Sequence, residues 1–159
     1  MPRTTPLQSA LFCAGVLFAS LSSYSFADEA DIDAANVTLN QLHQNATHAD
    51  WDSYFALYRQ DAVFIGTDAG ERWSMTEFAR YARPTKDWQY IPKDRKLIQH
   101  DKVILFDELL DSPAYGLSRG TGTLLKNGEH WQIAQYHLSF PIPNELAKSI
   151  TAQIKAASK

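Results

Sequence analysis

Four stretches of the sequence decide the fold: DAVFIGTD (61–68), followed by ERW (71–73), and RGTG (119–122), followed by WQIAQYHLS (131–139). The apolar run at 63–65 ends at Gly66, which is typical of a short strand followed by a turn. Gly116, Gly120 and Gly122 fall within one predicted strand and indicate that it bends, because glycine has no side chain to resist a tight curl. A sheet that curls over helices encloses a conical hollow.

The patterns around these stretches separate into helices first and strands after. Apolar residues recur at helical spacing over 30–48, and Asp50 is placed to cap a second helix at 51–58. The order Ser-x-x-Glu at 74–77 is a capping box, which predicts a third helix ending near Arg83 and Pro84. Four β-rich runs and a closing helix capped by Asn144 follow, the runs at 88–99, 102–110, 115–125 and 130–140. This order predicts an α+β domain with N-terminal helices on a strongly curved antiparallel sheet.

The segment at 58–63, Tyr-x-x-Asp-Ala-Val, and the Trp-x-Ile-Ala strand at 131–134 resemble the nuclear transport factor 2-like superfamily, specifically its SnoaL-like branch. The resemblance extends over 28–159 and implies a cone-shaped α+β fold that serves enzymes, ligand binders and assembly modules alike. It also implies a homodimer formed through the outer side of the sheet. The acid–base set of ketosteroid isomerase, a member of the superfamily, is missing, since Gly66, Gly122 and the region of Leu42 stand in its place.

The first 27 residues predict a signal peptide. Arg3 precedes a short apolar stretch at 7–21, and SFA (25–27) places small residues around a cleavage point after Ala27. An uncleaved membrane anchor is the alternative, although the stretch is short for a permanent span. We therefore expect residues 28–159 to form a periplasmic or secreted domain with no stable membrane insertion after cleavage.

The composition of the chain argues against several kinds of site and partner. The only cysteine, Cys13, lies in the predicted signal peptide, so we expect no disulfide and no cysteine-ligated metal. The five histidines show no metal-binding spacing, which predicts no metal and no cofactor. The formal net charge is −3 and basic residues form no run, so we expect no nucleic-acid partner.

Asp68 and His137 are the predicted acid and base of a possible active site. The period of two along 131–139 puts Gln135 and His137 on the same face as Trp131 and Ile133, and therefore in the cavity. Asp68 lies in the turn after the first strand, where the resemblance places the mouth of the cavity. The alternatives are a core histidine held by hydrogen bonds and an aspartate that only shapes a turn.

Five further residues are predicted to contact a ligand. Arg72 can hold an anionic group, and Gln135 supplies a polar contact on the last strand. The aromatic rings of Trp73, Tyr81 and Trp88 can line an apolar pocket, although most aromatic residues in such a domain belong to the core. The carboxylates of Asp107 and Glu108 are interpreted as partners of Arg119 in ordinary salt bridges across the sheet.

The sequence thus predicts an exported domain that binds a small, partly apolar molecule in its cone. Two alternatives stay open. The domain can be a cofactor-free isomerase, lyase or hydrolase that uses Asp68 and His137, or a dimeric assembly module.

Overall fold

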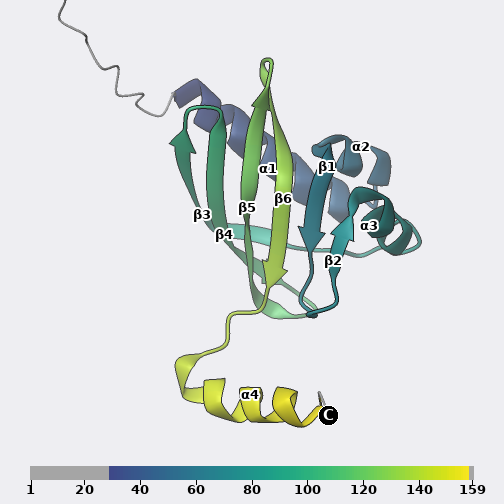
Figure 1. The fold of residues 1–159 in the computed structure, drawn as a ribbon, viewed down its shortest axis with the longest axis vertical. Coiled ribbons are helices and arrows are strands. Elements are labelled where there is room, and N and C mark those ends of the chain that lie inside the picture. The colour runs from purple at the N-terminus through teal and green to yellow at the C-terminus, as the bar shows by residue number, and fades with distance from the viewer. Residues whose placement is uncertain (1–28, 158–159) are drawn as a thin grey trace, which may run out of the picture.

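A computed structural model describes residues 29–157 of the chain (Figure 1), so the predicted signal peptide lies outside the described residues. The elements in chain order are α1 (Glu29–Thr47), α2 (Trp51–Ala56), β1 (Tyr58–Ile65), β2 (Arg72–Ser74), α3 (Met75–Ala82), β3 (Ile91–His100), β4 (Val103–Ser112), β5 (Gly116–Asn127), β6 (His130–Ser139) and α4 (Asn144–Ala157). The predicted α+β class is confirmed, with helices before the strand meander.

The short helices begin where their capping residues predict. The Asp50 carboxylate accepts a hydrogen bond from the Ser53 amide, which satisfies one of the unpaired donors at the start of α2. At α3, the Ser74 hydroxyl accepts from the Glu77 amide, and the Glu77 carboxylate accepts from the Ser74 amide. This reciprocal pair is the capping box that the sequence predicts.

The six strands form one open sheet in the order β2-β1-β6-β5-β4-β3. Strands β3 to β6 form an antiparallel meander, but β1 runs parallel to β6. The expectation of a wholly antiparallel sheet is therefore wrong in this detail. The reason is that β1 and β6 are joined through the whole meander and not by a hairpin, so nothing forces them to run in opposite directions.

Helix α1 packs on one face of the sheet, which we call the inner face (Figure 1). Its buried residues recur at helical spacing: Ala35, Thr38, Leu39, Leu42, His43 and Ala46. The Thr38 hydroxyl donates to the Trp131 carbonyl of β6, and the Trp131 indole donates to Asp31. These contacts hold α1 in one position across the sheet.

The opposite side, the outer face, carries no helix in the view of Figure 1. One row of cross-strand neighbours on it runs through Val63, Gln135, Thr123, Leu105 and Ile98. Leu105 and Ile98 are 44% and 57% exposed, so this face is partly apolar and open to solvent.

A β-bulge in β6 changes which side chains face inward. Thr123 pairs with Gln135, but the next residue of β5, Leu124, pairs with Ile133, so Ala134 is an extra residue without a partner on β5. Because an extra residue reverses the alternation, Ile133 and Tyr136 both point to the inner face. Gln135 and His137 then point to the outer face.

The closing helix α4 lies beyond one end of the sheet (Figure 1). It begins at Asn144 as predicted, but none of its residues is buried. Leu146 and Ile154, which belong to its apolar stripe, are 48% and 55% exposed. This helix therefore adds no side chain to the hydrophobic core of the domain.

Candidate functional site

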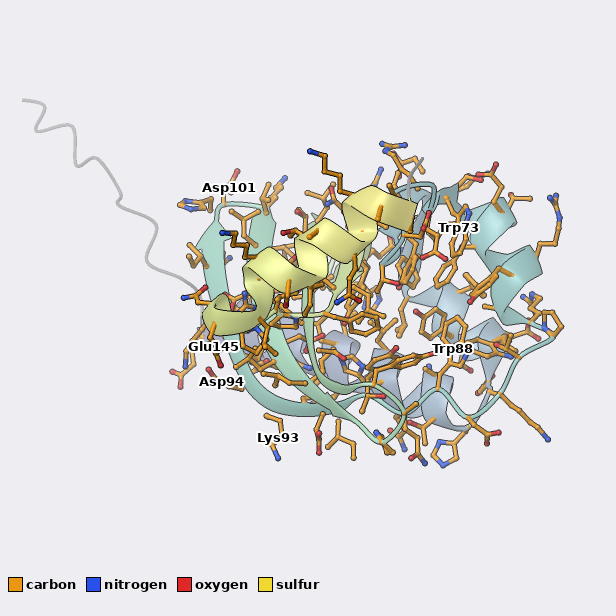
Figure 2. The ribbon with its side chains drawn as sticks, turned by 90° about the horizontal axis from the view of Figure 1, so that it is seen from below. Trp73, Trp88, Lys93, Asp94, Asp101 and Glu145 are labelled. Atoms are coloured by element: carbon orange, nitrogen blue, oxygen red, sulfur yellow. The ribbon has the colours of Figure 1, made fainter. Side chains whose placement is uncertain are left out.

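A pocket of about 430 Å³ opens between α1, the inner face of the sheet and the loops at one end of the strands. We call it the aromatic pocket, because rings form much of its wall: Tyr54, Phe64, Trp73, Phe78, Tyr81, Trp88, Tyr90, Tyr115, Tyr136 and Phe140. In Figure 2, Trp73 and Trp88 lie on one side of the domain, away from Lys93, Asp94 and Asp101 on the other side. The pocket thus belongs to the half of the domain that contains β1, β2 and α3.

The rings of the pocket are held by one another. Phe64 stacks on Phe78 with ring centroids 3.7 Å apart, and Trp73 stacks beside Phe78 at 5.8 Å. Nearer the surface, Tyr81 lies 4.7 Å from Trp73. Such ring pairs favour a fixed arrangement, so the side chains of this largely apolar wall hold one another in place.

Trp88 lies in the pocket wall because the chain before β3 is a loop and not a strand. The predicted strand at 88–99 begins only at Ile91. The Trp88 ring packs at 4.9 Å from Trp51 and at 6.0 Å from Phe78, which turns it toward the helices. Burial of the neighbouring Tyr90 raises the pKa of its phenol to about 12, so this pocket hydroxyl stays protonated near neutral pH.

Polar side chains meet at one part of the pocket wall. His43 of α1 and Tyr136 of β6 both line the pocket, and both contact Glu108 of β4. The His43 Nε2 atom lies 2.8 Å from Glu108 Oε1, and the Tyr136 hydroxyl donates to the same oxygen at 2.9 Å. Glu108 itself is fully buried and does not line the pocket.

Arg95 of β3 completes this group, which we call the Glu108 cluster: His43, Arg95, Glu108 and Tyr136. The Arg95 Nε donates to Glu108 Oε2 at 2.8 Å, and a second guanidinium nitrogen lies 2.8 Å from the same oxygen. The third nitrogen donates to the side-chain oxygens of Asn36 and Asn40 on α1. The guanidinium is thus fixed between helix and sheet, where it holds the carboxylate in one orientation.

The surroundings of Glu108 favour its ionised form. Burial raises the pKa of the carboxyl, but hydrogen bonds from His43 and Arg95 and the guanidinium charge of Arg95 act against burial, and the pKa lies below its ordinary value. Burial also raises the pKa of the Tyr136 phenol well above its ordinary value, and the negative charge of Glu108 adds to this effect. Tyr136 therefore stays a neutral donor to an anionic Glu108.

Gly120 of β5 leaves the space that the Glu108 cluster occupies. A Cβ atom at Gly120 would collide with the Tyr136 hydroxyl and would lie 3.0 Å from Glu108 Oε1. The sequence indicates bending of β5 from its glycines, but at this position the absence of a side chain also makes room for a buried hydrogen bond.

Three of the predicted ligand-binding residues, Trp73, Tyr81 and Trp88, do line the aromatic pocket. Arg72 and Gln135 are exposed and are not part of its wall. Arg72 is on the short strand β2 beside Ile65, and Gln135 is on the outer face.

The structure does not bring Asp68 and His137 together in the pocket. Asp68 shapes the turn after β1, where its carboxylate accepts a hydrogen bond from the Gly70 amide at 2.8 Å. His137 pairs with Thr121 on the outer face, so the expectation that it shares the cavity with Trp131 and Ile133 is wrong. The physical reason is the bulge at Ala134, which a strict period of two does not anticipate.

The sequence reasoning missed His43 in the pocket wall and the buried Glu108 behind it. His43 follows Leu42 on the buried side of α1, so its helical position was a signal that it faces the sheet. Glu108 alternates with Phe106 and Leu110, which are both buried, and that period of two was a signal that its carboxylate is buried. It pairs with His43 and Arg95 and not with Arg119.

Among residues 29–157, no group of three or more His, Cys, Asp and Glu side chains is placed to hold a metal ion. In the same part of the chain, no helix is long and apolar enough to cross a membrane.

Several solved structures share the fold. An NTF2-like protein of unknown function from Pseudomonas putida matches with a TM-score of 0.62 at 15% identity, covering 74% of this chain and 92% of that one. An NTF2-like protein from Cytophaga hutchinsonii matches with a TM-score of 0.59 at 13% identity, covering 69% and 98%. An NTF2-like protein of unknown function from Shewanella baltica matches with a TM-score of 0.60 at 11% identity, covering 70% and 95%. At these identities the likeness shows the fold and not the activity.

No curated protein matches the sequence. The model of the SnoaL-like domain matches residues 35–143, which include every strand and every residue of the Glu108 cluster. The chain therefore belongs to the SnoaL-like domain family, on the nuclear transport factor 2-like fold.

Proposed function

We propose that the domain binds a small, ring-bearing, partly apolar molecule in the aromatic pocket. The observation that carries this proposal is the wall itself, a set of stacked rings around about 430 Å³ of open space. That volume is in the range of small-molecule sites, which are mostly apolar with a few polar groups. His43 and Tyr136 are such polar groups here.

Exposed rings at the pocket support the same proposal. Tyr81 and Tyr115 are 51% and 65% exposed, although both line the pocket. Large apolar surface left open to water around a concave site is typical of a surface that a ligand covers. A flat ligand ring can stack on these side chains at little conformational cost, because Tyr81 already packs against Trp73 and Tyr115 already stacks on Phe140.

The test is ligand binding followed by tryptophan fluorescence, since Trp73 and Trp88 both line the pocket. Nitrophenols and naphthols serve as ring-bearing probes, and an aliphatic alcohol of similar size serves as the comparison. We expect the aromatic probes to quench the fluorescence saturably and to raise the melting temperature, and the alcohol to do neither.

Two matched variants locate the binding. Tyr81→Ala should weaken binding of a nitrophenol by about fivefold, since an aromatic contact contributes about 1 kcal/mol. Ile98→Ala removes a similarly exposed apolar side chain from the outer face and should leave binding unchanged. Equal losses in both variants, or no saturable binding of any aromatic probe, would refute the proposal.

A further inference from the structure

Ligand binding alone does not account for the Glu108 cluster. A buried ion pair is seldom more stabilising than well-packed apolar residues of the same volume, because both charges lose their hydration. The Glu108 and Arg95 side chains are 0% and 9% exposed. An apolar wall would hold the apolar part of a ligand at least as well, so binding of apolar surface does not explain why these charges are buried here.

The cluster fixes the proton positions of His43. An ionised Glu108 has no proton to donate, so His43 Nε2 must donate to it across their 2.8 Å contact. The second ring nitrogen, Nδ1, makes no hydrogen bond to any residue within 29–157. In the neutral ring Nδ1 carries a lone pair, and His43 belongs to the pocket wall. A carboxylate behind one nitrogen and an unshared pair on the other is the arrangement of a general base.

We propose that His43 is a catalytic base that removes a proton from a ring-bearing molecule in the aromatic pocket, with Glu108 as its positioning residue. This inference rests on the binding proposed above. In the step, a C–H or O–H bond of the substrate breaks and its proton moves to Nδ1. The electron pair of that bond stays on the substrate, where it forms a new double bond as a leaving group departs or as a neighbouring bond shifts.

Glu108 contributes by charge and by orientation. When Nδ1 takes the proton the ring becomes a cation, and the carboxylate at Nε2 stabilises it. Arg95 keeps Glu108 ionised. The Tyr136 hydroxyl donates a second hydrogen bond to Oε1, beside the one from His43. The proton then returns from Nδ1 to the leaving group or to a different atom of the same substrate. The reaction class is therefore elimination or isomerisation started by proton abstraction, without a cofactor.

The probe is nitrobenzisoxazole, a flat aromatic bicycle whose ring C–H proton is removed by any well-placed base. As the proton leaves, the nitrogen–oxygen bond breaks and a coloured cyanonitrophenolate forms. We expect the protein to open this ring with saturation kinetics. His43→Gln should lower kcat about 100-fold or more, as expected for the loss of a general base. The dissociation constant of cyanonitrophenol for His43→Gln, measured by tryptophan quenching, should stay within about threefold of that for the original protein, because the stacking rings are intact.

His137→Gln is the matched control, since its ring lies on the outer face, and it should keep full turnover. Product binding without turnover in the original protein, or full turnover in His43→Gln, would overturn the catalytic role and leave the binding proposal standing. If the protein neither binds cyanonitrophenol nor opens the probe, the binding proposal fails and the catalytic role fails with it.

NMR of the ring nitrogens in the unaltered protein supplies a readout that does not depend on any variant folding. We expect the neutral His43 ring to carry its proton on Nε2 and to leave Nδ1 bare. Glu108→Gln, where it folds, should lose this preference and lower kcat more than it raises KM, as for a positioning residue. A proton on Nδ1 of the neutral ring would overturn the inference.

Discussion

Gly120→Ala is the substitution whose effect is most directly set by the structure. The backbone of Gly120 does not have a positive φ, so alanine is compatible with its conformation. The new methyl group would instead collide with the Tyr136 hydroxyl and lie 2.8 Å from the ring carbon that bears it. Neither neighbour moves easily, because Tyr136 packs against the rings of Phe64 and Phe106 and Glu108 is held by His43 and Arg95.

The expected cost follows from two destabilising contributions and one stabilising contribution. Overpacking a dense interior destabilises by about 1–3 kcal/mol. Loss of the buried hydrogen bond from Tyr136 to a charged acceptor adds about 1.5–3 kcal/mol. Replacing a strand glycine returns about 0.5–1 kcal/mol of conformational entropy. The net loss in the free energy of unfolding is about 2–5 kcal/mol, or about 6–15 °C in Tm for a domain of this size.

Urea unfolding followed by circular dichroism measures this loss. Gly70→Ala is the control for the change from glycine to alanine itself, since Gly70 also lacks a positive φ and a new Cβ there would meet only the exposed Asp68 carboxylate, at 3.2 Å. Tyr136→Phe combined with Gly120→Ala should cost less than the sum of the two single changes, because the colliding hydroxyl is gone. A Gly120→Ala protein as stable as the original, or fully additive costs, would refute the steric argument.

Three further predictions concern charge, assembly and processing. Because the pKa of Glu108 lies below its ordinary value of 4.5, its stabilisation is present above that pH and is lost as the pH falls through the folded-state pKa. The free energy of unfolding should therefore fall more steeply with decreasing pH in the original protein than in Glu108→Gln. Equal slopes in the two proteins would contradict this. We expect a homodimer through the outer face, where Ile98 and Leu105 pair; sedimentation should show dimers, and Leu105→Lys should give monomers. Intact-mass measurement of the exported protein should show cleavage after Ala27, and retention of residues 1–27 would exclude it.

Local signals in the sequence were enough to predict most of the fold. Asp50 and Ser74 cap helices because capping depends on residues within one turn, which are visible in a short window. The strand meander is likewise marked by turns that lie between β-rich runs. The parallel pairing of β1 with β6 could not be predicted in this way, because it joins two strands that lie far apart in the sequence.

Local sequence signals predicted less of the candidate site than of the fold. Trp73 and Trp88 do line the pocket, as large aromatic residues near loops either fill a core or line a cavity, and their contact with a ligand stays a prediction. The Glu108 cluster was not predicted, since α1, β3, β4 and β6 each contribute one residue and only the folded sheet brings them together. His137 was placed on the wrong face because one extra residue reverses a period of two.

The bulge at Ala134 also makes the polar groups of the pocket depend on strand register. If β6 kept all its residues but paired with β5 without the bulge, simple alternation after Ile133 would turn His137 inward and Tyr136 outward, away from Glu108. Deletion of Ala134 would remove only the extra residue, so Tyr136 would stay in the pocket and keep its hydrogen bond to Glu108. A slip of one residue in β6 would thus exchange the polar groups available to a bound molecule, although no residue had been substituted.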